Sequence, residues 1–474
     1  MNLSHYKVKN DRLTIIIIVG CLLRIVYFIW GADIYLGEKK YIMGDTAGWT
    51  ESFINLLENG TYTFDITNPD AAFGRVPGFS FFWGIHYLIF GNYVYQAVAI
   101  SQLILDTIAI YIIYQITINI YNHNNTAIIA SILYATYPFI IGWITVSYSE
   151  LLTNFSILII IYLITKKDKS KKHFVYIGCL CAIAFFIREF AGILFPIAVI
   201  TFFVSDKISI KTKTQCSTLV ILSFITVYSA WPIRNFINHN RLVLARTMGG
   251  FERYNEDFLA FRTWVNTWDP DESKWLAQLA SSDSQIKYPN QAFVNDIERE
   301  KANKLTALSR SCGTSFQYWR SDYNLPVNSK YNCNEEIARG FNELTMSLIK
   351  NKTWFYFTNV PLKNLHKAIF KNELFSGSVI QSNTQKIMSL LFGYRTILII
   401  LGFTGVVLSW KYKGIIPIAG YCIFMYLFLS FVIRFLEMRN LLQADTLLLI
   451  PAAYSISQAF VFINTDWRQM LLNK

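Results

Sequence analysis

The chain has 474 residues, of which 53% are hydrophobic and only 16% are charged. Soluble globular proteins carry about a quarter of their residues as charged side chains, so this composition favours a protein that crosses a membrane several times. The net charge of +12 would fit nucleic-acid binding, but the Lys and Arg residues fall in short clusters between apolar segments. Nucleic acid is therefore excluded as a partner, and the length fits one membrane domain with an inserted loop domain.

Residues 1–236 predict a membrane module that begins with an uncleaved anchor. The apolar segment 13–31 is long enough to cross about 30 Å of hydrocarbon, and no small-residue cleavage site follows it. A polar first outer loop, residues 32–92, separates this anchor from the next long apolar segment.

The first outer loop predicts a helix that lies along the membrane surface. Its apolar residues recur at helical spacing over Thr46–Asn59, and Gly60 follows as the residue after the C-cap. Asp45 would lie at the N-terminus of this helix. It is expected to act there either as a plain N-cap or as a functional carboxylate.

Ten apolar segments are predicted to span the membrane. They are residues 13–31, 93–121, 126–143, 149–164, 174–187, 192–204, 217–232, 388–410, 415–432 and 441–463. The basic clusters between them and both termini fall on one side, which the positive-inside rule assigns to the cytoplasm. The expected fold class is an all-α polytopic membrane protein of about 10 to 12 transmembrane helices, in the cytoplasmic membrane.

Residues 237–385 predict an extracytoplasmic loop domain, and residues 386–474 predict the C-terminal transmembrane helices. Tryptophans and a charged helical pattern indicate that the loop domain is folded. Its last part, Thr353–Phe370, combines aromatic and basic residues and predicts an interfacial helix. Cys312 and Cys333 are the only cysteines in this section and would pair in an oxidising compartment, with two free thiols as the alternative.

Polar residues gather at the predicted outer ends of the spans. The chain has no Walker A motif, no glycine-rich dinucleotide motif after a strand, no HExxH and no paired CxxC motif of the zinc kind, so a soluble nucleotide cofactor is unsupported. The rim residues are Asp45, Arg75, Glu150, Arg188, Glu189, Arg234, Asn235, Arg434, Glu437 and Arg439. Charge beside a membrane is costly unless paired, although any single member has snorkelling or a structural ion pair as its alternative. Arg24 and Asp106 lie deeper in their spans and are expected to pair with each other.

Over residues 13–250 the chain resembles a known family. The motifs that carry the resemblance are, in chain order, Gly44-Asp45 before the amphipathic helix, Gly60-Thr61-Tyr62, Arg75-Val76-Pro77-Gly78-Phe79, Phe90-Gly91, Tyr137-Pro138, Ser149-Glu150, Ile187-Arg188 and Trp231-Pro232-Ile233-Arg234-Asn235. They are similar to those of the GT-C glycosyltransferases, in the branch of the dolichyl-phosphate-mannose protein mannosyltransferases and the bacterial aminoarabinose transferases. Two features depart from the family. Thr46 stands where an acidic pair often continues, and the last third matches poorly, although Arg434–Asn440 before the final span is similar to the closing segment of the family. Arg241–Lys350 has no match.

The resemblance implies transfer of a sugar from a polyprenyl-phosphate donor to a hydroxyl of an extracytoplasmic protein, lipid or glycan acceptor, with inversion. Asp45 would be the general base, and Glu150 would orient the acceptor or an arginine, or hold a divalent cation, so the metal requirement stays open. The forked donors of Arg75, Arg234 and Arg188 suit the donor phosphate. Further donor or acceptor contacts are expected from Asn235, Glu437 and Arg439.

Two other functions stay open. A secondary transporter would place polar residues near the bilayer midplane within inverted repeats, whereas most charges here lie at the outer rim. A transferase that moves a whole lipid-linked oligosaccharide would share nearly every feature above. The mass of the added group separates that enzyme from a single-sugar transferase.

Overall fold

Helices make up all the regular structure of the computed structural model, which describes residues 11–204, 209–247, 254–321, 323–325, 332–370 and 383–472 and contains no strand within them. The helices of the membrane bundle are α1 (Asp11–Val26), α5 (Val94–Tyr121), α6 (Asn124–Ala135), α7 (Pro138–Ile141), α8 (Ser149–Thr165), α9 (Lys171–Ile187), α10 (Leu194–Val204), α11 (Ile210–Tyr228), α19 (Asn383–Leu408), α20 (Ile416–Leu427) and α21 (Leu442–Leu472). Each of the ten predicted spans falls on one or two of these helices and the short turns that extend them. The all-α fold class is therefore confirmed.

Several helical segments of the described residues are long and apolar enough to cross a membrane. They are Asp11–Lys40, Pro77–Tyr121, Ile210–His239, Lys386–Leu408, Lys413–Ile433 and Met438–Phe462. Two shorter apolar helices, Ser149–Thr165 and Glu189–Val204, accompany them. The chain is thus a multi-pass membrane protein, with buried aliphatic side chains joining α5, α6, α8, α9, α10, α20 and α21 into one core.

Buried polar contacts tie this core together. The predicted pair of Arg24 and Asp106 is confirmed, because Arg24 Nε lies 2.7 Å from Asp106 Oδ2 and both side chains are fully buried. Tyr134 Oη donates to Asp106 Oδ1 at 2.5 Å, and Asn154 Nδ2 donates to Tyr134 Oη at 2.9 Å. Thr446 Oγ1 then donates to Asn154 Oδ1 at 2.5 Å. One network therefore links α1, α5, α6 and α8 to the last helix, α21.

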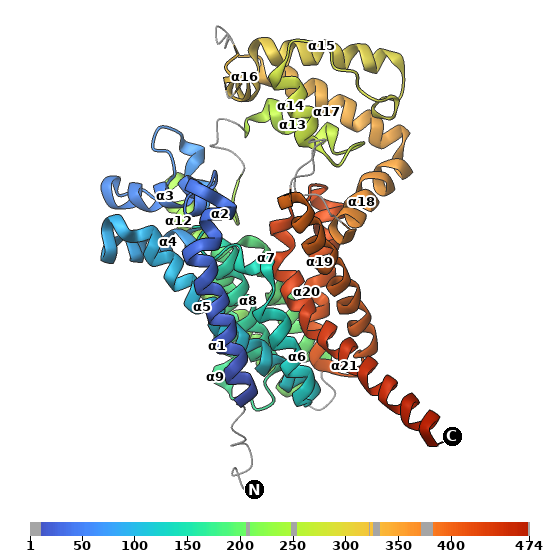
Figure 1. The fold of residues 1–474 in the computed structure, drawn as a ribbon. Helices are drawn as coiled ribbons and strands as arrows, with labels where there is room; N and C mark the ends of the chain where they lie inside the picture. Colours follow the sequence, from blue (N-terminus) through green and yellow to red (C-terminus); the bar gives the residue numbers. More distant parts are fainter. Residues whose placement is uncertain are drawn as a thin grey trace.

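The basic connections between spans lie at one end of the bundle. Tyr121, the last residue of α5, contacts Tyr412 with a ring separation of 5.3 Å, which brings Lys411 and Lys413 to the end of the bundle where α1 begins. Figure 1 shows the helices between residues 256 and 370, which we call the outer domain, at the opposite end. Lys7, Lys9 and Lys207, which contribute to the predicted cytoplasmic charge, lie outside the described residues.

A layer of short helices caps the opposite end of the bundle beside the outer domain (Figure 1). It contains α2 (Ala32–Leu36), α3 (Thr46–Asn59), α4 (Pro77–Phe90) and α12 (Ala230–His239), with the short turns η4 (Pro69–Phe73) and η6 (Glu189–Ile193). The predicted bounds of α3 are confirmed, and Gly60 ends it with a φ of +68°, a left-handed conformation that favours glycine. Gly84 lets α4 approach α3 closely, because a Cβ there would lie 2.4 Å from the ring of Phe53.

The outer domain is a separate helical unit with its own core. Its helices are α13 (Glu256–Val265), α14 (Glu272–Ser281), α15 (Asp296–Cys312), α16 (Thr314–Ser321), α17 (Asn334–Asn351) and α18 (Thr353–Phe370). The core is aromatic, with Trp264 and Trp268 fully buried. The predicted disulfide is present between Cys312 and Cys333, with a Cα–Cα distance of 5.5 Å, and joins the end of α15 to the start of α17. The predicted bounds of α18 are also confirmed.

Candidate active site

A continuous set of ion pairs lies where α3, α8 and the turn before α21 begin. We call it the rim cluster, and its members are Asp45, Arg75, Glu150, Arg188, Glu437 and Arg439. Every member was predicted as a rim residue from the sequence. The structure brings them together from the first outer loop, two spans and the turn η11 (Met438–Leu441).

Asp45 stands between two arginines. Its Oδ2 lies 2.7 Å from Arg439 Nη2, and its Oδ1 lies 3.3 Å from Arg75 Nη2. Asp45 precedes α3, but its side chain makes no capping hydrogen bond. Its backbone N–H instead donates to Tyr148 Oη at 2.7 Å. Asp45 is therefore the N-cap residue of α3 by position, but its carboxylate is directed to arginines and not to the helix N-terminus.

The charge state of Asp45 follows from these neighbours. Burial raises the pKa of the carboxyl, but Arg75 and Arg439 outweigh burial and bring the pKa below its ordinary value of 3.8. Asp45 is thus ionised at neutral pH and able to accept a proton. While both guanidinium groups hold it, however, it is a weak base.

Arg75 is held in place by packing. It is 9% exposed, and its guanidinium carbon lies 4.7 Å from the centre of the Trp49 ring. A Cβ at Gly48 would lie 3.0 Å from Arg75 Nε, so the small residue leaves room for the guanidinium. Pro77 opens α4 two residues later and fixes the backbone there. The side chain is therefore positioned by both α3 and α4.

Glu150 is the most buried carboxylate of the rim cluster. Its side chain is 2% exposed, and its Oε1 lies 2.7 Å from Arg188 Nη1 and 3.9 Å from Arg439 Nη1. Arg188 Nη2 also donates to Asn440 Oδ1 at 2.5 Å. Glu150 Oε2 is buried and has no hydrogen-bond partner among the described residues. An unpaired buried oxygen is costly, so it is a candidate contact for a bound hydroxyl.

Arg234 and Asn235 serve the first outer loop and lie outside the rim cluster. Arg234 Nη2 donates to the carbonyl of Tyr62 at 2.5 Å, and its Nη1 donates to the carbonyl of Ala72 at 3.0 Å and to Asn235 Oδ1 at 2.8 Å. Asn235 in turn donates to the carbonyl of Val243 at 2.9 Å. No contact among the described residues joins Arg234 to Asp45. Of the predicted phosphate-binding arginines, the structure thus brings together Arg75 and Arg188 but not Arg234.

Arg434, in the membrane domain, donates hydrogen bonds to the outer domain. Its Nε donates to the carbonyl of Asn266 and its Nη2 to the carbonyl of Tyr356, both at 2.9 Å. The guanidinium carbon also lies 3.9 Å from the centre of the Tyr356 ring. Arg434 has a φ of +58°, which is uncommon for a residue with a Cβ. Another predicted rim residue, Glu189, pairs with Arg246 at 3.1 Å.

Sequence reasoning missed Tyr148 and Asn440 at this site. Tyr148 accepts the Asp45 N–H, and its ring lies 5.4 Å from the guanidinium carbon of Arg439. Both residues directly adjoin predicted residues: Tyr148 precedes the Ser149-Glu150 motif, and Asn440 follows Arg439 at the end of the Arg434–Asn440 segment. That adjacency is the one signal by which the sequence could have marked them.

The carboxylates of the rim cluster are all engaged in ion pairs. Each of its carboxylates already faces at least one arginine. Among the described residues, no group of three or more His, Cys, Asp or Glu side chains could hold a metal ion.

A sequence-family comparison covers the middle of this site. Residues 74–231 match the model of the dolichyl-phosphate-mannose-protein mannosyltransferase family. The match confirms the resemblance to GT-C glycosyltransferases over that region, which includes Arg75, Glu150 and Arg188. Asp45 precedes the matched region, and Arg234 and Arg439 follow it. No curated protein sequence matches the chain.

Solved structures with a related arrangement are distant. An oligosaccharyltransferase, AglB from Archaeoglobus fulgidus, in complex with an inhibitory peptide and a dolichol-phosphate, is 13% identical with a TM-score of 0.49, covering 98% of this chain and 51% of that chain. ArnT from Cupriavidus metallidurans, bound to undecaprenyl phosphate, is 11% identical with a TM-score of 0.36, covering 92% of this chain and 77% of that chain. The chain thus spans about half the length of the oligosaccharyltransferase. At these scores neither likeness carries a functional argument.

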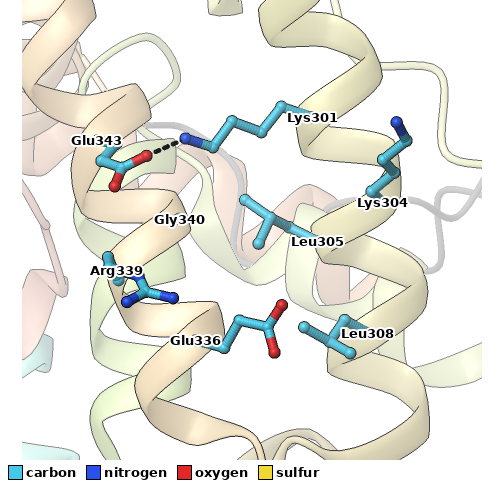
Figure 2. A pocket seen from close by; sticks show the side chains of 8 residues that line it. All are labelled: Lys301, Lys304, Leu305, Leu308, Glu336, Arg339, Gly340 and Glu343. Atoms are coloured by element: carbon cyan, nitrogen blue, oxygen red, sulfur yellow. Dashed lines mark hydrogen bonds and ion pairs between the residues drawn. The ribbon is translucent and has the colours of Figure 1, made fainter.

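A surface hollow of about 570 Å³ lies apart from the rim cluster, between α15 and α17 of the outer domain (Figure 2). It is lined by Lys301, Lys304, Leu305, Leu308, Glu336, Arg339, Gly340 and Glu343. Lys301 and Glu343 form an ion pair across it. The hollow shares no residue with the rim cluster, and its mixed charges point to no particular ligand.

Proposed function

We propose that the chain is an integral-membrane glycosyltransferase. It moves a sugar from a polyprenyl-phosphate-linked donor to a hydroxyl of an extracytoplasmic protein, lipid or glycan acceptor, with inversion at the anomeric carbon. The observation that carries the proposal is the rim cluster, in which a carboxylate and several arginines converge at the ends of membrane helices. The family match over residues 74–231 supports it.

The position of the rim cluster suits a lipid-linked donor. The prenyl chain of such a donor lies in the bilayer, and its phosphate lies at the level of the headgroups. Arg75 lies two residues before the start of α4, whose exposed side is apolar: Ile85, Leu88 and Ile89 are 55%, 63% and 67% exposed. A prenyl chain along α4 would place its phosphate beside Arg75. Arginine suits that phosphate because its planar fork donates two hydrogen bonds to neighbouring oxygens.

The chemistry then follows from the two kinds of group. Asp45 accepts the proton of the acceptor hydroxyl, and the hydroxyl oxygen forms a bond to the anomeric carbon. The bond from that carbon to the phosphate oxygen breaks, and its electron pair leaves with the phosphate. Arg75 stabilises the charge that develops on the leaving oxygen. Inversion follows because the hydroxyl attacks opposite the leaving phosphate.

Glu150 and Arg188 have supporting roles in this mechanism. The free Oε2 of Glu150 is placed to accept a hydrogen bond from the acceptor or the sugar. Arg188 Nη1 pairs with Glu150 Oε1 at 2.7 Å and holds the carboxylate in place. Their removal should therefore disturb acceptor placement more than donor binding.

The proposed orientation places the active site outside the cytoplasmic membrane and both termini in the cytoplasm. The basic connections at the far end of the bundle support this orientation through the positive-inside rule. The disulfide between Cys312 and Cys333 supports it as well, because disulfides persist in oxidising compartments. Reporter fusions after Lys169 and Ser281 should read cytoplasmic and external, respectively.

The purified chain, incubated with a panel of lipid donors and membrane-derived acceptors, tests the function. The panel holds polyprenyl phosphates with one sugar and polyprenyl diphosphates with an oligosaccharide, and mass spectrometry measures the group added. We expect addition of one sugar and release of polyprenyl phosphate, both lost in Asp45→Asn. Transfer of an oligosaccharide would identify the alternative transferase, and no transfer from any donor would contradict the proposal.

A further inference from the structure

We propose that Asp45 occupies the position of the donor phosphate in the donor-free enzyme, and that the arriving phosphate displaces it by binding Arg75 and Arg439. The inference rests on the proposed function and deepens it. It assigns Arg439, from the C-terminal part of the chain, as the second arm of the phosphate site. It also makes Asp45 available as a base only once the donor is bound.

The geometry of Asp45 is that of a bridging anion. Its two oxygens are each given to a different arginine, at 3.3 Å from Arg75 Nη2 and 2.7 Å from Arg439 Nη2. A phosphate also presents two oxygens on one central atom. It can therefore bridge the same two guanidinium groups, with the tetrahedral oxygens spreading slightly wider than those of a carboxylate.

The arginines are better anchored than the carboxylate between them. Arg439 Nε is held by Glu437 Oε2 at 2.5 Å, and its guanidinium lies over Tyr148. Arg75 is packed on Trp49. Asp45 is 36% exposed in its side chain and makes no capping bond to α3. It can therefore rotate away without cost to the helix, while both arginines stay.

Charge balance favours this exchange. The rim cluster holds three arginines and three carboxylates, so its charges cancel before the donor arrives. A donor phosphodiester adds one negative charge, and one carboxylate must then give up its partners. Glu150 is 2% exposed and cannot reach water, and among the described residues Glu437 contacts only Arg439. Asp45 is the carboxylate that occupies both Arg75 and Arg439.

The exchange determines when Asp45 can act as a base. In the donor-free state the two arginines keep the pKa of Asp45 below its ordinary value, although burial opposes them. When the phosphate takes over the arginines, Asp45 loses that stabilisation and gains a negative neighbour, so its affinity for a proton rises. The base becomes effective when the donor is in place to react.

Binding of undecaprenyl phosphate to the purified full chain in detergent micelles, measured by native mass spectrometry and by fluorescence titration, tests the exchange. Asp45→Asn removes the competing charge and should bind the lipid about 5- to 20-fold more tightly than the wild type. Asp45→Glu keeps the competing charge and should not bind more tightly. The matched control is Asp70→Asn, which removes an exposed carboxylate paired with Arg241 in the same layer and should leave binding unchanged.

The outcomes separate this inference from the proposed function. Wild-type binding with equal or weaker binding by Asp45→Asn overturns the exchange and leaves the function standing. Tighter binding by Asp70→Asn to the same extent would show a general charge effect and also overturn it. No binding by any folded variant, with folding checked by thermal unfolding, would count against both. Should Asp45→Asn fail to fold, Asp45→Ser is judged by the same criterion.

Discussion

Arg439 Nη2 lies 2.7 Å from Asp45 Oδ2, although the two residues are 394 positions apart in the chain. The last helix makes this contact possible, because α21 is fixed from two sides. Thr446 joins it to Asn154 of α8, and the buried Asp445 pairs with Arg395 of α19 at 2.7 Å. The candidate active site is therefore complete only when the C-terminal helices have packed against the N-terminal module.

Asp45→Asn should reduce turnover by about 10²- to 10⁴-fold, the range for loss of a positioned general base. The change keeps the shape of the side chain, and no capping bond is lost. The free energy of unfolding should fall by no more than about 1 kcal/mol, because a partly exposed ion pair contributes little to it. Steady-state kinetics and thermal unfolding check both, with Asp70→Asn as the control. Turnover within a few-fold of wild type would remove Asp45 from the mechanism.

Arg75→Lys and Arg234→Lys should affect different properties. At Arg75, lysine keeps the positive charge but loses the forked pair of hydrogen-bond donors. The activation free energy of sugar transfer should therefore rise by about 1–3 kcal/mol. At Arg234 it loses bonds to the carbonyls of Tyr62 and Ala72, so stability should fall with little change in donor affinity. Arg241→Lys, at an exposed ion pair, is the control. The assignment fails if Arg75→Lys binds and transfers donor as well as wild type.

Arg434→Gln should loosen the outer domain. The substitution removes donors to the carbonyls of Asn266 and Tyr356, which cross the junction between the two domains. We expect faster cleavage of the outer domain in limited proteolysis, and a raised KM for the acceptor with donor affinity unchanged. Arg299→Gln, on the surface of the outer domain, is the control. An unchanged cleavage rate would show that the junction does not depend on Arg434.

Cys312→Ser should destabilise the outer domain by roughly 3 kcal/mol, because the disulfide closes a loop with a sequence separation of 21 residues. The control is Cys179→Ser, which replaces a free, partly buried cysteine in α9. Non-reducing peptide mapping establishes the bond directly, and thermal unfolding with and without reductant measures its effect. Two free thiols in protein isolated without reductant would contradict the pairing.

The pH dependence of kcat/KM for the donor should follow Asp45 in the free enzyme. Asp45 must be ionised, so activity is lost as the pH falls. Arg75 and Arg439 contact its carboxylate, Arg188 acts on it from farther away, and Tyr148 binds its N–H. Because they bring the pKa below 3.8 despite burial, kcat/KM should stay flat down to about pH 5. The ion pairs of Asp45 also stabilise the folded protein at pH values above the ordinary pKa of 3.8. This contribution to the free energy of unfolding is lost as the pH falls through the lowered pKa of the folded state.

An acid limb of kcat at higher pH than that of kcat/KM would fit the exchange of Asp45 for phosphate, because kcat reports the enzyme with donor bound. Rate measurements across pH at low and at saturating donor separate the two. A kcat/KM limb near neutral pH would mean that the arginines do not hold Asp45 in the free enzyme.

The sequence by itself determined the local structure of this protein. The apolar segments predicted the spans, helical spacing predicted the bounds of α3 and α18, and Gly60 marked the end of α3. Even two long-range pairs followed from the sequence: Arg24 with Asp106, and Cys312 with Cys333. A helix forms through hydrogen bonds between residues four apart, and a buried charge or an external cysteine has few alternative partners, so these features need little tertiary information.

Only the tertiary structure decided which rim residues come together in the candidate active site and which contact other parts of the chain. Arg75, Arg234 and Arg439 look alike in the sequence, each an arginine at the outer end of a span. In the folded protein, Arg234 donates hydrogen bonds to carbonyls of the first outer loop, whereas Arg439 donates to Asp45. Which partner an arginine meets depends on how α12 and α21 pack against the rest of the chain. That packing is a sum of many distant contacts, and no local pattern in the sequence contains it.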